Sequence, residues 1–193
     1  MKIKIKIKNI SFLKQKTKAY LRYRWRAKNA HGLHSPFLFD LYYKVFYHKK
    51  KFFNSKRLFF LAKKDQILIN FLNYLEISAV DYIGTDFSVF KDKIQNFVKA
   101  DCTCLDKKNL FLAQKNEKKI KKILFLDEKN LSLDLMSLDL NLYSGVVFQN
   151  PWLNQEWMNF FRQKNQFSVT IDSFYWGFAL VRPQRKQHFV IKT

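Results

Sequence analysis

The pattern of hydrophobic and polar positions changes character near residue 65 of this 193-residue chain. After that point, short apolar runs alternate with amphipathic segments of helical period, as in sheets with helical crossovers. Helices are predicted over residues 65–76, 88–98 and 154–164. Strands are predicted over residues 78–83, 101–105, 110–113, 123–127, 145–149, 167–173, 176–182 and 188–191. We therefore expect a mainly parallel sheet, with 167–173 and 176–182 as an antiparallel pair at its edge.

The segment before residue 65 has a different pattern. Residues 1–9 alternate Lys with Ile, which predicts an amphipathic strand if they order, and a free basic arm that orders on its partner is preferred. Residues 11–30 are predicted to be helical. A second helix is expected to start at Ser35-Pro36, with Ser35 as its N-cap, and to run to about Tyr47. One face of the first helix collects Phe12, Ala19, Tyr20, Tyr23 and Ala27.

Charge sharpens this division. The net charge is +21, and residues 1–64 carry 19 Lys and Arg against one acid, whereas residues 65–193 carry 17 against 14. Such an asymmetry indicates a polyanionic partner, either nucleic acid or an anionic membrane surface. Some of the lysine excess is explained equally well by an AT-rich genome. The sequence predicts a basic, mainly helical extension over 1–64 and an α/β domain over 65–193.

Residues 20–26 interleave aromatic side chains with arginines. Arginine pairs with phosphates in a bidentate way and aromatic rings stack on bases, so the run suits RNA. The candidate contacts are Arg22, Tyr23, Arg24, Trp25, Arg26 and Lys28. The alternative, given equal weight, is a solvated basic helix that its aromatic residues dock onto the main domain. A second basic cluster at 48–64 contains four phenylalanines and would suit an anionic lipid surface.

Other site chemistries find little support. Cys102 and Cys104 supply half of a zinc site and are interpreted as core thiols in a reduced cytoplasm. His31 and His34 lack a third ligand nearby, so capping and loop packing are the expected roles, and no metal is expected. No stretch approaches the roughly 20 apolar residues of a membrane span, and residues 1–8 lack the apolar region of a signal peptide. A cytoplasmic location is expected.

Two segments resemble a known family. Residues 26–37 (RAKNAHGLHSPF), within 20–40, and residues 145–191, with the motifs TIDSF at 170–174 and QHFVI at 187–191, resemble bacterial class I S-adenosylmethionine (SAM)-dependent methyltransferase-like, or O-methyltransferase-like, proteins. The resemblance implies a Rossmann-like seven-stranded sheet whose last two strands form an antiparallel hairpin. It also implies SAM as the cofactor.

The middle of the chain departs from that family. Its members carry an acidic residue and two or more glycines after the first strand. When the motif is anchored on Gly84, the acid position falls on Tyr82 and the later glycine on Ser88, while Asp81 is expected to point to the opposite face. The remaining candidates for binding SAM are Gly84, Asp86 and Asp106.

A second departure follows the strand at 145–148, which in the family commonly ends in two aspartates. Gln149 and Asn150 stand there in this chain. Replacing carboxylates by amides removes hard-cation ligation and general-base chemistry together. No catalytic residue is therefore expected.

These observations favour a non-catalytic protein on a degenerate methyltransferase fold, which holds RNA through its basic N-terminal segment. The first alternative is an active SAM-dependent methyltransferase with an atypical pocket, since methyl transfer needs little beyond positioning. The second alternative is a peripheral membrane or assembly protein. No cofactor is expected under the favoured hypothesis.

Overall fold

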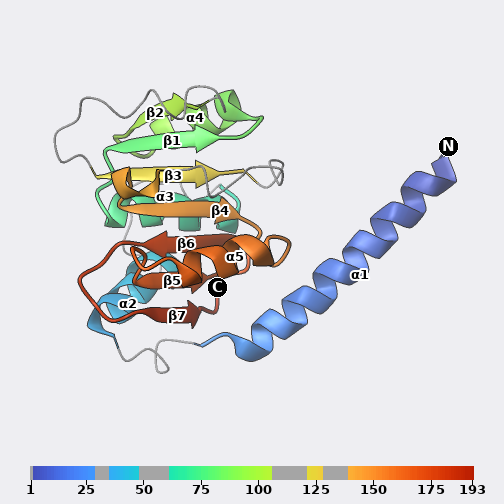
Figure 1. Ribbon diagram of the computed structural model, residues 1–193. Helices are drawn as coiled ribbons and strands as arrows, with labels where there is room; N and C mark the ends of the chain where they lie inside the picture. Colours follow the sequence, from blue (N-terminus) through green and yellow to red (C-terminus); the bar gives the residue numbers. More distant parts are fainter. Residues whose placement is uncertain (1, 29–34, 48–60, 106–120, 128–138) are drawn as a thin grey trace.

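A seven-stranded sheet with helices on both faces forms the centre of the computed structural model (Figure 1). The structure describes residues 2–28, 35–47, 61–105, 121–127 and 139–193. The strands run in the order β2-β1-β3-β4-β6-β5-β7. Their bounds are β1 Ala79–Ile83, β2 Asp101–Cys104, β3 Lys122–Leu126, β4 Gly145–Gln149, β5 Val169–Asp172, β6 Trp176–Leu180 and β7 Gln187–Val190.

The pairing confirms a mixed, mainly parallel sheet. Strands β2, β1, β3 and β4 are parallel to one another, whereas β6 is antiparallel to both β4 and β5. The predicted antiparallel pair is therefore confirmed, but its predicted place at the edge is wrong. Strand β6 inserts between β4 and β5, and β7 pairs in parallel with the free side of β5, so β7 and not the antiparallel pair is the last strand on that side of the sheet. The strand predicted at 110–113 lies outside the described residues.

Most helices cover one face of the sheet. That face carries α2 (Pro36–Leu41), the π-helix η2 (Tyr42–Phe46), α3 (Lys63–Tyr74) and α4 (Phe87–Gln95). Their side chains share one buried cluster with the β1, β3, β5 and β6 residues that point to this side. Apolar residues from both sides of position 64, where the composition changes, therefore lie in one core.

Helix α5 (Gln155–Gln163) covers the opposite face. Trp157, Met158 and Phe161 pack there against the β3, β4 and β6 side chains of a second buried cluster. The short 3-10 helix η6 (Leu140–Leu142) precedes β4 on this side. The spacing of Trp157, Met158 and Phe161 is that of a helix with one buried face, as the sequence predicted.

Ser35 stands before α2 in extended conformation, and its carbonyl accepts a hydrogen bond from the backbone N–H of Phe39. The predicted helix start is thus confirmed. The predicted side-chain cap is not, because the Ser35 hydroxyl makes no capping hydrogen bond.

The N-terminal segment forms one long helix, α1 (Lys2–Arg26), whose N-terminal end stands away from the sheet (Figure 1). The strand predicted for residues 1–9, and the free arm preferred over it, are wrong for residues 2–9. A lone strand leaves its backbone groups without partners, whereas a helix satisfies them internally, and Lys and Ile both tolerate helices.

Helix α1 also ends earlier than predicted, at Arg26 instead of residue 30. Lys28 leaves the helix and extends the sheet beside β7. Its N–H donates to the Val190 carbonyl at 2.8 Å, and the Lys192 N–H donates to the Lys28 carbonyl at 2.9 Å.

Candidate functional site

The strand order reverses at β1, since β2 lies on one side of it and β3 and β4 on the other. In open α/β sheets, ligands bind outside the carboxyl ends of the strands at such a reversal. Gly84 follows the carboxyl end of β1, and Asp127 follows that of β3. These residues define the carboxyl edge of the sheet, where the sequence placed a SAM site.

The side chain of Tyr82 closes this edge. Its hydroxyl donates a hydrogen bond to Asp127 Oδ2 at 3.0 Å, and both side chains are buried. The ring of Tyr82 stacks on Phe125 at 5.4 Å and packs against Phe90 of α4 at 4.6 Å. Burial and the Asp127 carboxylate raise the pKa of the Tyr82 hydroxyl, so it stays protonated and keeps donating.

Gly84 leaves room for this pair. A Cβ on Gly84 would lie 2.5 Å from Asp127 Cβ and 2.5 Å from the Tyr82 hydroxyl oxygen. Gly84 was predicted to let a ligand come close to the backbone. In the structure, the side chains of Tyr82 and Asp127 take that space beside the Gly84 backbone. Sequence reasoning missed Asp127. The available signal was that Tyr82 stands where the methyltransferase motif has an acid, while Asp127 ends the predicted strand at 123–127, which was expected to lie parallel to the strand that carries Tyr82.

The other two predicted SAM contacts have different positions. Asp86 is the N-cap of α4, where its side chain makes no capping hydrogen bond, and its backbone hydrogen-bonds the Tyr82 hydroxyl. Asp106 lies outside the described residues. The structure therefore brings Gly84 and Asp86 to one turn, where both border Tyr82.

Asp81 is engaged on the opposite face of the sheet, as predicted. It is buried, pairs with Lys122 Nζ at 2.9 Å and accepts a hydrogen bond from the Tyr143 hydroxyl at 2.8 Å. A buried carboxylate held by two donors is not available to a ligand at the carboxyl edge.

The backbone of Gln149 and Asn150, at the end of β4, takes part in a local turn. Asn154 donates its Nδ2–H to the Gln149 carbonyl at 3.0 Å, and Asn150 adopts a left-handed backbone with φ of 46°. In the described part of the chain, no three His, Cys, Asp or Glu side chains come together as a metal site would require. Burial raises the pKa of the half-buried Cys102 thiol, which favours its protonated form. Cys104 is exposed in the edge strand β2, so the interpretation of both cysteines as core thiols is wrong for Cys104. His31 and His34 lie outside the described residues.

Helix α1 docks on the sheet through aromatic side chains, as the alternative interpretation predicted. Tyr20 and Tyr23 contact Phe174 at ring-centroid distances of 5.0 and 5.2 Å. The Tyr23 hydroxyl donates to the Ile191 carbonyl and accepts the Thr193 N–H at 3.1 Å. We call this docked side, made of Ala19, Tyr20 and Tyr23 of α1 together with Ala27 directly after it, the inner face.

Tyr23 is therefore not placed to stack on a base, which corrects its assignment as a nucleic-acid contact. It is only 6% exposed, and burial raises the pKa of its hydroxyl. Tyr23 lies on the apolar side of α1, and a helix with one apolar side turns that side to the core.

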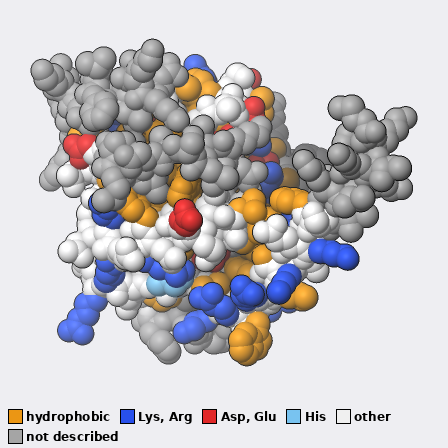
Figure 2. Space-filling model, turned by 45° about the vertical axis from the view of Figure 1, so that its right-hand side comes forward, with side chains coloured by type: hydrophobic (Ala, Val, Ile, Leu, Met, Phe, Trp, Pro, Cys, Tyr) orange, Lys and Arg blue, Asp and Glu red, His pale blue; other side chains and the backbone are white. Residues whose placement is uncertain are grey.

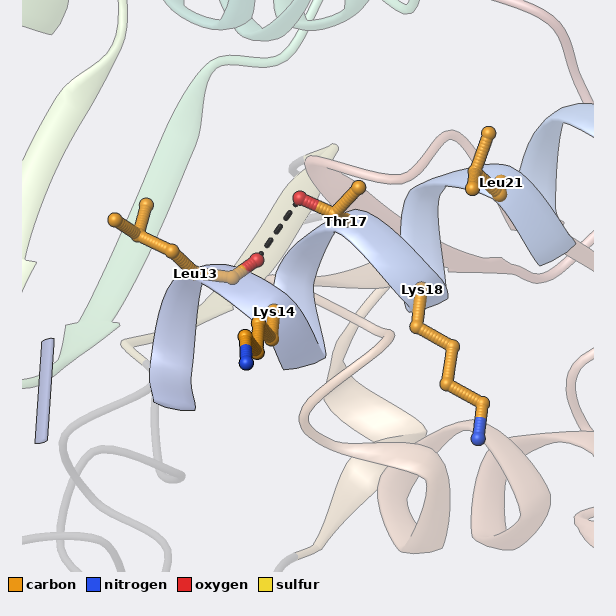
Figure 3. Close-up of a pocket in the computed structure, with 5 residues that line it drawn as sticks. All are labelled: Leu13, Lys14, Thr17, Lys18 and Leu21. Carbon is orange, nitrogen blue, oxygen red and sulfur yellow. Dashed lines mark hydrogen bonds between the residues drawn. The ribbon is translucent and has the colours of Figure 1, made fainter. Parts of the chain in front are cut away.

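The opposite side of α1 is exposed. Five of its residues line an open hollow, namely Leu13, Lys14, Thr17, Lys18 and Leu21. Figure 3 shows Thr17 and Leu21 pointing to one side of the helix and Lys14 and Lys18 to the other, with the Thr17 hydroxyl donating to the Leu13 carbonyl at 2.9 Å. We call these five residues and Trp25 the outer face.

The predicted nucleic-acid contacts other than Tyr23 all have exposed side chains. Trp25 is 89% exposed, and Arg22, Arg24, Arg26 and Lys28 are exposed as well. The Arg24 guanidinium lies 6.0 Å over the Tyr20 ring, so part of its interaction is with the protein. Figure 2 shows Lys and Arg side chains gathered along the lower part of one view, with hydrophobic side chains among them.

No protein-family model, curated protein or solved structure matches this chain. The resemblance to methyltransferases accordingly stays a prediction. None of the described helices is both long enough and apolar enough to span a membrane. The basic cluster predicted at 48–64 lies mostly outside the described residues.

Proposed function

We propose that this chain is a non-catalytic protein that binds RNA through α1. The observation that carries the proposal is the exposed indole of Trp25 beside a row of cations on a helix whose other side is docked. Lys14, Lys18 and Arg22 succeed one another at four-residue spacing, and Trp25 follows three residues later, so all four share one side of the helix. Lysine and arginine attract phosphates, and an exposed indole stacks on bases.

The charge of α1 is of one sign. No acidic residue occurs in the chain before Asp40, so α1 has no acid of its own to neutralise its cations. Binding driven by such a surface releases counterions from RNA and weakens steeply as salt is added.

The non-catalytic part of the proposal is supported by the carboxyl edge of the sheet. Tyr82 and Asp127 occupy the ends of the two strands between which a nucleotide-type ligand would approach. Two features support the proposal that the sheet is of methyltransferase type. The strand order reverses at β1, and β6, which lies between β4 and β5, is antiparallel to both of its neighbours.

A second candidate is an anionic membrane surface. Leu13 and Leu21 are 60% and 63% exposed and stand beside Lys14 and Lys18, as in helices that lie in the lipid interface. RNA is favoured because Thr17 interrupts this apolar row at its centre and the residues around Trp25 are arginines, which pair phosphates bidentately.

The test measures binding of the full chain to a fluorescently labelled RNA hairpin by anisotropy, at salt concentrations from about 50 to 200 mM. We expect affinity to fall steeply with salt. The variant K14E/K18E/R22E should weaken binding by at least tenfold, because it reverses three cations that share one side of α1.

The matched control K99E/R185E/K186E makes the same charge change at exposed positions in the turns before β2 and β7. Equal losses in both variants, or salt-independent affinity, would overturn the proposal. Flotation on phosphatidylserine vesicles without RNA binding would favour the membrane candidate. Micromolar calorimetric binding of SAM would overturn the non-catalytic part.

A further inference from the structure

A second group of basic side chains lies near the C-terminal end of α1, where the chain passes from the helix to the sheet beside β7. Arg26 stands in the last turn of α1, Arg162 in the last turn of α5 and His188 in β7. The Arg162 guanidinium donates a hydrogen bond from Nη2 to His188 Nε2. Thr170 of β5, which is paired with His188 in the sheet, lies with its hydroxyl oxygen 2.9 Å from His188 Nδ1. We call Arg26, Arg162 and His188 the basic junction.

The hydrogen bonds fix the state of His188. A guanidinium is always a donor, so His188 Nε2 is unprotonated and Nδ1–H donates to the Thr170 hydroxyl. Burial and the nearby guanidinium groups of Arg162 and Arg26 lower the pKa of His188 to about 3. The imidazole is therefore neutral near pH 7 and holds Arg162 in place without adding charge.

The donors of Arg162 are not used up by this contact. Its Nε–H is buried and has no hydrogen-bond partner among the described residues. Burial lowers the pKa of the Arg162 guanidinium, and so does the positive charge of Arg26. Two cations that repel each other beside a buried, unused donor are stabilised by an anion that bridges them.

Asp172 is the carboxylate in the electrostatic neighbourhood of both arginines. Its Oδ1 accepts the backbone N–H of Phe174 at 2.9 Å, and burial raises its pKa. No ion pair within 4.0 Å joins it to Arg26 or Arg162; the ion pairs seen among described residues involve other side chains. Asp172 thus offsets part of the positive charge without occupying the guanidinium donors.

We propose that Arg26 and Arg162 form a phosphate subsite for the RNA backbone, in which His188 is a positioning residue for Arg162. The inference rests on the proposed function, and it extends the binding surface from α1 onto the sheet. Lys28 and Lys192, which are exposed and joined by a backbone hydrogen bond, continue the positive surface beside the same strand. The ligand class is a phosphodiester monoanion, contacted through a bidentate guanidinium fork.

The experiment compares R162Q, R26Q and the matched control R185Q, whose arginine is exposed in the turn before β7. Anisotropy with the labelled RNA hairpin is measured across the same salt series. We expect R162Q and R26Q each to weaken binding about five- to twentyfold and to reduce the salt slope by about one. R185Q should leave both quantities near those of the wild type. The side chain of Arg26 is exposed, so R26Q should fold normally, and it still tests the subsite if R162Q does not fold.

The variant H188F separates positioning from charge. A neutral imidazole contributes no counterion release, so H188F should weaken binding while the salt slope stays unchanged. If the wild type binds RNA and R26Q, R162Q and R185Q all bind it with the same affinity as the wild type, the subsite is overturned and the proposed function stands. No RNA binding by the wild type would overturn the proposed function itself.

Discussion

The carboxyl edge of the sheet and the basic junction both bring polar side chains together, and they differ in how completely those side chains are satisfied. At the edge, the Tyr82 hydroxyl and the Asp127 carboxylate pair with each other inside packed aromatic rings. At the junction, Arg162 keeps a buried donor without a partner among the described residues, next to a second cation. A satisfied pair has nothing to offer a ligand, whereas an excess of donors and positive charge suits an anion.

The same contrast divides α1 into two faces. Tyr23 and Trp25 are two residues apart, yet one is buried with its hydroxyl bonded and the other is almost fully exposed. The first holds the helix on the protein, and the second is available to a partner. Docking and binding should therefore be carried by different residues of α1.

The largest effect is expected at the closed edge. The change Tyr82→Ala removes a fully buried ring and should lower the free energy of unfolding by about 3–5 kcal/mol. The control Y82F keeps the ring and loses the hydroxyl, with its hydrogen bonds to the Asp127 carboxylate and the Asp86 backbone, which should cost about 1–3 kcal/mol. Urea unfolding monitored by circular dichroism measures both. A loss below about 1 kcal/mol in Y82A would show that the ring does not close the edge.

The next effect concerns the docking of α1. Tyr23→Phe removes the hydroxyl that joins the helix to the Ile191 carbonyl and the Thr193 N–H, and should destabilise the protein by about 1–2 kcal/mol. Tyr20→Phe is the matched control, because no hydrogen bond of the Tyr20 hydroxyl is seen among the described residues. It should change stability by less than about 0.5 kcal/mol. Equal stabilities of Y23F and Y20F in urea would contradict docking through the Tyr23 hydroxyl.

The sheet was largely predictable from the sequence. Apolar runs such as 79–83 and 145–149 are bounded by polar residues, and each forms a strand within one residue of its predicted limits. The structure of the N-terminal segment was not predictable in the same way. A period of two in the sequence predicts a strand only where a neighbouring strand exists to pair with it. Helix α1 satisfies its own backbone and needs no such neighbour.

The sites were less predictable, because their partners are far apart in the chain. Tyr82 and Asp127 are separated by 45 residues, and Arg162 and His188 by 26. The sequence indicated exposed arginines near residue 24 correctly, yet it gave Tyr23 the same role. Aromatic and basic residues that alternate along a helix fall on different faces, and only the docking surface decides which face is buried.

An effect on stability of similar size is expected from pH at the basic junction. The pKa of His188 is about 3 in the folded protein against 6.5 for a free imidazole, so the unfolded chain binds more protons between these values. Stability therefore falls as the pH is lowered from about 7 to 5, and His188 should contribute roughly 2 kcal/mol of that loss. The guanidinium groups of Arg162 and Arg26 lower the pKa of the imidazole further, and the hydrogen bond to Thr170 offsets only part of this shift, so these neighbours leave the sign unchanged.

The variant H188Q isolates this contribution, because glutamine also accepts a hydrogen bond from Arg162 and does not titrate. The difference in unfolding free energy between wild type and H188Q should shift by roughly 2 kcal/mol across that pH range, in favour of H188Q at the acidic end. Parallel pH profiles of the two proteins would show that His188 is not held neutral in the folded state.

The smallest effect on stability, and the most informative one for function, is expected at Trp25. Because its side chain is almost fully exposed, Trp25→Ala should change the free energy of unfolding by less than about 0.5 kcal/mol. RNA affinity should nevertheless fall about tenfold, the loss of one base–aromatic stack, and W25F should restore most of it. Leu21→Ala is the matched control on the same face. Stacking on RNA predicts that L21A binds like the wild type, whereas burial in lipid predicts that L21A and W25A weaken vesicle binding together. Equal RNA affinities for W25A and the wild type would remove Trp25 from the interface and leave only the cations of α1.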